Sequence, residues 1–201
     1  MNSILEMLTP DHLRSVVEAK MSKDAAHDWY HIERVYRNGL HIAKTEPSAD
    51  QIVLQAALVL HDIGEKTIGK GNAIVNEALI GQILTPLGVP VTKLPAIVIA
   101  INEHSFTRGA KPSNLEAAIV QDADRLDAIG AIGIARAFAY GGANNRPLYA
   151  PNDPTNTIQH FDDKLFKLRG LMNTSEGQRL ADERHEFMQQ FVAKFMDEWA
   201  G

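Results

Sequence analysis

Helical spacing governs nearly the whole chain. Apolar residues recur every three or four positions, while the strict alternation of a β-strand is almost absent. This spacing places apolar side chains on one face of a helix, which is stable when it is buried against other helices. The predicted helices lie at about 9–21, 27–45, 50–60, 72–84, 95–104, 113–126, 128–140, 158–171 and 175–199. The segment Ala143–Thr157 is interpreted as a lid or binding loop because of its length. We therefore expect an all-α fold in a single domain that spans residues 1–201.

Composition narrows the class of protein. The 201 residues are 45% apolar and 22% charged, which are ordinary globular values, and the chain is long enough to bury a core. The net charge is −5 without a run of Lys and Arg, which argues against a long nucleic acid as partner. Cysteine is absent, which excludes disulfides, thiolate metal sites and a thiol nucleophile. Neither a signal peptide nor a bilayer-spanning apolar stretch is visible, so we expect a cytoplasmic protein, with both a monomer and a homodimer open.

An apolar run, Ile52–Leu60, ends abruptly in the doublet His61-Asp62. An imidazole and a carboxylate side by side are poor core formers but good ligands for a divalent metal. Two other segments offer the same kinds of side chain, His27–His31 upstream and Asp122–Asp127 downstream. These three segments together indicate a metal site.

The order of these groups resembles the HD-domain superfamily of metal-dependent phosphohydrolases, whose signature is a His, a His-Asp doublet and a distant Asp, all on helices. The matching motifs are His31-x-x-Arg34-Val35, Leu60-His61-Asp62-Ile63-Gly64 and Asp122-Ala123-Asp124-Arg125-Leu126. The segment Asp127–Arg136 is also similar to a bacterial branch, the YedJ/YpgQ-like proteins. The resemblance implies a helical bundle of the HD type, with the metal-site core at about 24–127 and the C-terminal helices of 128–201 packed on it.

By this resemblance the metal ligands are His31, His61, Asp62 and Asp124. Two imidazoles and two carboxylates suit one divalent ion (Mn, Ni, Co, Fe or Mg), and zinc less well because it prefers four-coordinate sites. Such an ion activates water and neutralises charge on phosphoryl oxygens. The implied activity is hydrolysis of a small phosphorylated metabolite, with a nucleotide expected, as a nucleotide phosphatase or pyrophosphohydrolase. The alternative is a non-catalytic sensor that binds metal or nucleotide on the same fold.

Charged residues that follow the doublet are candidates for catalysis together with Asp62. Glu65 is placed to accept a proton from water, and Lys66 to meet a phosphate oxygen, although a solvated turn explains both residues equally well. Lys70 lies between Gly69 and Gly71 and is a candidate for closing over a phosphate. The spacing of this glycine pair is not that of a P-loop.

Further substrate contacts are expected from His27 and Arg125, and the resemblance implies that His104 contacts substrate or binds a second metal ion. His27 lies one helical turn before His31, and the pair also fits the His-x-x-x-His spacing of zinc peptidases, an interpretation that leaves His61-Asp62 unexplained. Arg125 is a candidate for binding phosphate or for an ion pair with Asp62 or Asp124. Within Asp122-Ala123-Asp124, the second Asp is the preferred ligand, and the first is interpreted as a helix-surface residue or as a partner of the ligands.

Overall fold

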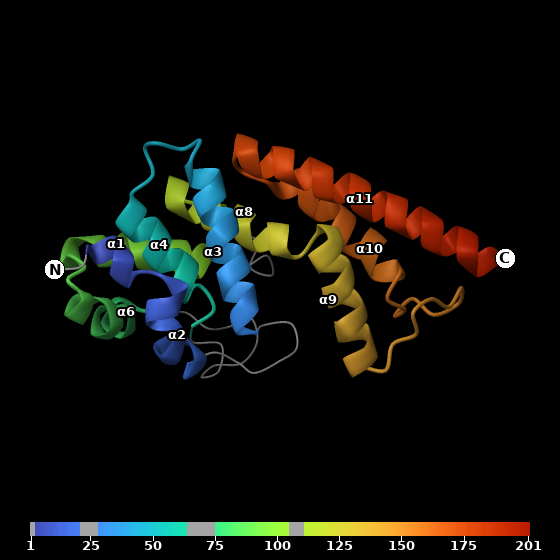
Figure 1. The fold of residues 1–201 in the computed structure, drawn as a ribbon, viewed down its shortest axis with the longest axis horizontal. Coiled ribbons are helices and arrows are strands. Elements are labelled where there is room, and N and C mark those ends of the chain that lie inside the picture. Colours follow the sequence, from blue (N-terminus) through green and yellow to red (C-terminus); the bar gives the residue numbers. More distant parts are fainter. Residues whose placement is uncertain (1–2, 21–27, 64–74, 105–110) are drawn as a thin grey trace. The chain divides into compact units, whose positions relative to one another are not determined.

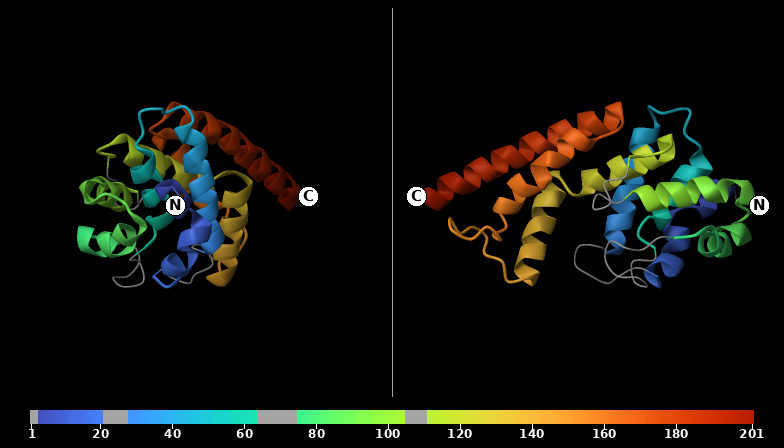
Figure 2. Two further views of the ribbon diagram at one scale, coloured as in Figure 1. Left: turned by 60° about the vertical axis from the view of Figure 1, so that its left-hand side comes forward. Right: turned by 180° about the vertical axis from the view of Figure 1, so that it is seen from behind.

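The structure is a computed structural model that describes residues 3–20, 28–63, 75–104 and 111–201. Figures 1 and 2 show helices and connecting segments throughout these residues, and no strand occurs among them. The prediction of an all-α fold is therefore confirmed. By its contacts the chain forms two compact units, Met1–Asp124 and Arg125–Gly201. The organisation as one domain stays a prediction.

The first unit is built from short helices that were largely expected from the spacing of apolar residues. An additional helix, α1, begins at the N-terminus with a capping box between Ser3 and Glu6. The helices of this unit are α1 (Ile4–Met7), α2 (Pro10–Glu18), α3 (Trp29–Ala43), α4 (Gln51–Leu60), α6 (Glu77–Leu84) and α7 (Leu94–Glu103), with the 3-10 helices η1 (Thr85–Leu87) and η2 (Val91–Lys93). Helix α8 (Leu115–Asp127) begins in the first unit and ends in the second.

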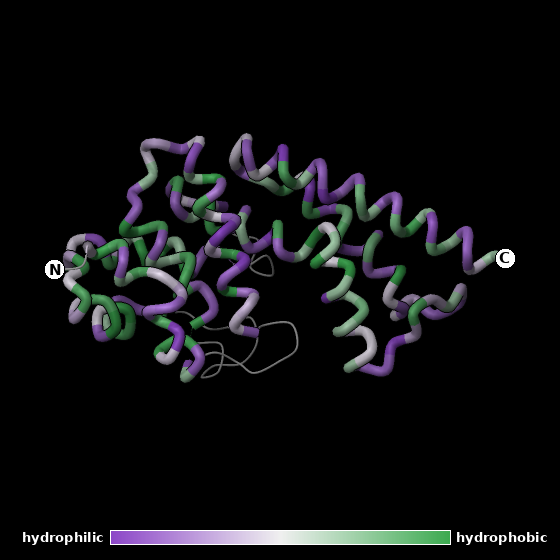
Figure 3. Tube along the Cα trace, in the orientation of Figure 1, coloured by the Kyte–Doolittle hydropathy of each residue, from purple (hydrophilic) through white to green (hydrophobic). Residues whose placement is uncertain are grey.

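Helix α4 forms the centre of the first unit. It contacts α1, α2, α3 and α7, and the eight residues from Val53 to Leu60 are all buried. Because α4 is apolar on nearly every side, as its trace in Figure 3 shows, it is stable only when it is surrounded by protein. Its N-terminus is fixed by Asp50, which accepts hydrogen bonds from the N–H groups of Ile52 and Val53 and pairs with Lys93.

Helix α3 approaches α4 unusually closely at Gly39. A Cβ atom at this position would lie 2.5 Å from two side-chain atoms of Leu58. The helix begins at the N-cap Asp28, whose carboxylate accepts from the backbone N–H of His31. This cap fixes the first turn of the helix, where His31 lies.

The second unit contains α9 (Gly130–Ala143), α10 (Gln159–Asp163), the 3-10 helix η4 (Leu165–Leu171) and the long helix α11 (Ser175–Ala200). Its aromatic cluster consists of Phe138, Phe161, Phe191 and Phe195, of which Phe161 is fully buried. The prediction of one helix at 158–171 was wrong. The backbone of Lys164 leaves the helical region (φ −136°, ψ −56°), and a 3-10 helix then buries Leu165 and Leu168.

The connection between α9 and α10 is folded onto itself. The backbone N–H of Thr157 donates to the carbonyl of Pro147 at 2.9 Å, and that of Ile158 donates to Leu148 at 3.1 Å. The side chain of Asn156 donates to the carbonyl of Ala150. These bonds tie the two ends of the loop together, and its role as a lid or binding loop stays a prediction. In the described part of the chain no helix has the length and apolar character needed to cross a membrane.

Candidate metal centre

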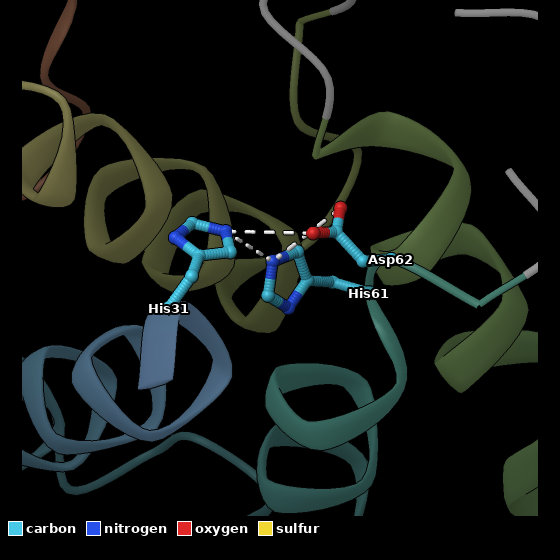
Figure 4. A group of neighbouring side chains, drawn as sticks. All are labelled: His31, His61 and Asp62. Carbon is cyan, nitrogen blue, oxygen red and sulfur yellow. Dashed lines mark hydrogen bonds and ion pairs between the residues drawn. The ribbon is translucent and has the colours of Figure 1, made fainter. Parts of the chain in front are cut away.

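Three of the four predicted ligands form a tight group, shown in Figure 4. His31 comes from the first turn of α3, and His61 and Asp62 come directly after α4. One potential ligand atom from each lies within 4.8 Å of the others. The Nε2 atoms of His31 and His61 are 3.2 Å apart, and His31 Nε2 lies 3.5 Å from an Asp62 carboxylate oxygen. All three residues are buried. The sequence therefore predicted correctly that these side chains converge.

Asp124 joins this group from α8. Its Oδ1 atom lies 3.4 Å from His31 Nε2. The side chain of Asp124 is 26% exposed, whereas those of His31 and Asp62 are 1% and 5% exposed. Asp124 is therefore the donor that faces solvent most openly. Asp122 is completely buried, so its interpretation as a helix-surface residue was wrong.

Hydrogen bonds to the backbone set the direction of the His61 ring. Its Nδ1 atom lies 2.9 Å from the carbonyl oxygen of Leu58. A carbonyl oxygen only accepts, so Nδ1 carries the proton and Nε2 presents a lone pair to His31 and Asp62. Metal-binding histidines commonly have this second bond, which fixes both the tautomer and the orientation of the ring.

His104 repeats this arrangement at the end of α7. Its Nδ1 donates to the carbonyl of Ile101 at 2.5 Å, and its Nε2 lies 3.7 Å from Asp62 Oδ1. The rings of His61 and His104 meet edge to face, with centroids 5.1 Å apart. Burial, followed by the nearby His61, lowers the pKa of His104, which favours the neutral imidazole. His104 thus borders the ligand group, and its contact with substrate stays a prediction.

The donor set fits a divalent cation. Ligand atoms that each lie about 2.1 Å from one ion are roughly 3.0–3.4 Å apart. The observed separations around His31 Nε2 are 3.2, 3.4 and 3.5 Å. A buried carboxylate such as Asp62 is also costly unless positive charge compensates it. Geometry and charge therefore both agree with an ion held by His31, His61 and Asp62, and Asp124 lies beside His31 as the further predicted ligand.

Helix ends supply further negative potential to this group. His61 is the C-cap of α4, His104 is the C-cap of α7, and Asp124 lies in the last turn of α8. A helix C-terminus carries about half a negative charge because its last carbonyl groups have no partner within the helix. Three such ends beside two carboxylates attract a cation and repel an anion.

Polar side chains tie the ligand-bearing helices together. The Tyr36 hydroxyl donates to Gln55 between α3 and α4, and Asn38 donates to the carbonyl of Ala123, the residue before Asp124. Gln121 donates to the carbonyl of Glu103, the residue before His104. The sequence did not single out these residues, because isolated amides on helices carry no spacing signal.

The structure describes only some of the other predicted site residues. Glu65, Lys66, Lys70 and His27 lie outside the described residues. Arg125 is buried and donates to the backbone carbonyl of Leu171, a bond that its sequence context did not predict. Its role in binding phosphate stays a prediction.

Comparison with known proteins gives a consistent result. A family model for the HD domain matches residues 28–129, the segment that contains all four predicted ligands. The YpgQ protein of Bacillus subtilis (strain 168) is 34% identical over 192 residues, which cover 93% of this chain and 92% of that protein.

Solved structures resemble the whole chain. The crystal structure of Bacillus subtilis YpgQ in complex with ADP has a TM-score of 0.79 and 32% identity, with 98% of this chain and 97% of that chain covered. A HD-superfamily hydrolase from Bacillus thuringiensis has a TM-score of 0.81 and 33% identity, with 99% and 100% covered. The chain therefore belongs to the HD-domain family and has the fold of the HD-superfamily hydrolases.

Proposed function

We propose that this protein is a metal-dependent phosphohydrolase that acts on a small phosphorylated metabolite, with a nucleotide as the substrate class. The convergence of His31, His61 and Asp62, with Asp124 3.4 Å from His31, carries this proposal. Similarity to a HD-superfamily hydrolase supports hydrolysis, and the complex of YpgQ with ADP supports a nucleotide. The proposed reaction is nucleotide phosphatase or pyrophosphohydrolase action.

The four ligands would hold one divalent ion, which when bound would polarise water and a phosphoryl oxygen. Manganese, nickel, cobalt, iron and magnesium suit this mixture of nitrogen and oxygen donors. His104, held by its bond to Ile101, would donate to or accept from substrate beside the ion. The partly exposed Asp124 marks the side on which solvent reaches the group.

Residues next to the doublet complete the proposal. Glu65 follows Asp62 by three positions and is proposed as the base that accepts a proton from water. Lys66 and Lys70 are proposed to neutralise phosphate oxygens, and His27 to orient the substrate.

The test uses protein stripped of metal with a chelator and then supplied separately with Mn²⁺, Co²⁺, Ni²⁺ or Mg²⁺. Nucleoside mono-, di- and triphosphates are offered, and release of phosphate is distinguished from release of pyrophosphate. We expect turnover by the wild type and none by His61→Ala, since loss of one ligand disrupts the coordination shell. Equal rates for the two proteins, or no turnover with any metal, would contradict the proposal.

The same experiment separates the enzyme from a sensor. YpgQ was crystallised with ADP, and a complex of this kind is a binding observation. A nucleotide that raises the Tm of this protein but is never hydrolysed would favour a non-catalytic binding module on the HD fold.

A further inference from the structure

The end of helix α8, immediately after Asp124, is held by side chains of the second unit. The guanidinium of Arg184, on α11, donates to the carbonyl of Leu126 at 2.5 Å. Arg136, on α9, donates to both the carbonyl and the carboxylate of Asp127, at 3.2 and 2.5 Å. Two arginines, one of them 58 positions away in the sequence, therefore bind the last two residues of the helix that carries Asp124.

Positively charged side chains are favourable at the C-terminal end of a helix. The last four carbonyl groups of a helix have no partner within it, and positive side chains there are favourable. After α8 the backbone makes two short-range bonds, from Ala128 N–H to the carbonyl of Arg125 and from Ile129 N–H to that of Leu126. Arg184 adds a long-range bond to Leu126 that fixes this turn against α11.

Glycine at position 130 makes room for this arginine. Gly130 has a φ of +75°, and a Cβ atom there would lie 3.0 and 3.1 Å from the Cγ and Cβ atoms of Arg184. Any larger residue would both strain the backbone and press on the side chain that reaches Leu126. The turn and the arginine are thus fitted to each other.

Asp124 depends on its helix more than the other ligands do. The side chains of His31, His61 and Asp62 are at most 5% exposed and are held by packing on all sides, whereas that of Asp124 is 26% exposed. It also lies within one turn of the end of α8, where helices fray. The direction of its carboxylate is therefore set chiefly by the backbone of this last turn.

We propose that Arg184 is a positioning residue that holds the last turn of α8 so that Asp124 faces His31. This inference rests on the proposed metal site, since it concerns the helix that carries Asp124. Arg184 contacts neither the ion nor the substrate in this proposal. It acts through Leu126 and the helix.

The test compares Arg184→Met, Arg184→Lys and Arg179→Met. Methionine keeps an unbranched stem beside Gly130 but removes the donor, and lysine keeps one cation. Arg179 is a matched control on the same helix, because it pairs with Glu176 and Glu183 at an exposed surface. The Kd for Mn²⁺ is measured by calorimetry at 25 °C on apoprotein whose helical content and Tm are verified by circular dichroism. The visible spectrum of the Co²⁺ form reports ligand geometry.

We expect Arg184→Met to weaken Mn²⁺ binding about tenfold, the lower end of the effect of residues that orient metal ligands, and to change the Co²⁺ spectrum. Arg184→Lys should recover most of the affinity, and Arg179→Met should match the wild type. A purely structural role would lower the Tm and leave Kd and spectrum unchanged in the folded protein, which would overturn the proposal.

Gly130→Ala perturbs the contact between position 130 and the Arg184 side chain. This variant replaces Arg184→Met in the test if Arg184→Met does not fold. Weaker Mn²⁺ binding by this folded variant would support the positioning role, and wild-type affinity would overturn it. A wild-type protein that binds no ion would instead overturn the metal site itself, so the two failures are distinguishable.

Discussion

The close approach of α3 and α4 at Gly39 gives a quantitative prediction about stability. These two helices bear His31 and the His61-Asp62 doublet, and a Cβ atom at position 39 would lie 2.5 Å from both Cδ atoms of Leu58. Leu58 is fully buried, so its side chain cannot turn toward solvent to escape. The perturbation is Gly39→Ala, which adds one methyl group at this contact.

Two opposing effects determine the size of the change. An extra methyl group in a well-packed core costs about 1–3 kcal/mol, while alanine is better than glycine inside a helix by about 1 kcal/mol. Gly142, in α9, isolates the second effect, because a Cβ atom there would meet nothing within 4 Å. The free energy of unfolding of Gly39→Ala should therefore lie about 1–3 kcal/mol below that of Gly142→Ala.

Urea denaturation followed by circular dichroism measures both variants under the same conditions. For a chain of this length, 1 kcal/mol corresponds to a Tm shift of roughly 2–4 °C. Adding Leu58→Val, which removes one carbon from the contact, should restore part of the loss in Gly39→Ala. Equal stability of the two alanine variants would refute the reasoning that α3 and α4 are in tight contact at Gly39.

Three further predictions concern chemistry and charge. Glu65→Gln should lower the rate of hydrolysis by about 100-fold or more while metal content, measured by elemental analysis, stays unchanged, and a full rate would remove Glu65 as the base. Burial raises the pKa of Asp50. The hydrogen bond and charge of Lys93, together with two backbone N–H groups, lower this pKa by more than burial raises it, so the net pKa is below its usual value. The stability that Asp50 contributes is therefore complete above about pH 4 and is lost as the pH falls through the lower folded-state pKa. Between about pH 6 and pH 2, the free energy of unfolding of Asp50→Asn should fall by less than that of the wild type. ADP should raise the Tm in the presence of Mn²⁺ and leave the metal-free protein nearly unchanged, and an equal rise in both would contradict a phosphate contact through the ion.

Much of the fold could be predicted because the helical spacing of apolar residues indicates which face of each segment is buried. The apolar run that ends at His61 is a strong local signal, and the structure contains the corresponding helix α4. The break at Lys164 was missed because Phe161, Leu165 and Leu168 fit one α-helical stripe as well as they fit a short helix followed by a 3-10 helix. Periodicity alone does not distinguish these two conformations.

The site residues that could be predicted are those whose chemistry is unusual for their position in the sequence. Histidines and carboxylates beside apolar runs stand out, whereas Asn38 and Gln121 are ordinary helix residues until the helices are assembled. Arg184 shows the same limit, since its partner is a backbone carbonyl 58 positions away. Contacts of this kind depend on tertiary structure, and a single sequence contains no local trace of them.

The convergence of helix C-termini on the ligand group bears on the order of binding. The ends of α4 and α7 and the last turn of α8 add partial negative charges to those of Asp62 and Asp124. A phosphate group approaching this site without a cation would be repelled by these negative charges, at distances where water screens charges poorly. A divalent ion reverses the sign of the local potential, and the side of the group marked by Asp124 remains open to solvent. The same backbone that would hold the cation thus makes phosphate binding conditional on it.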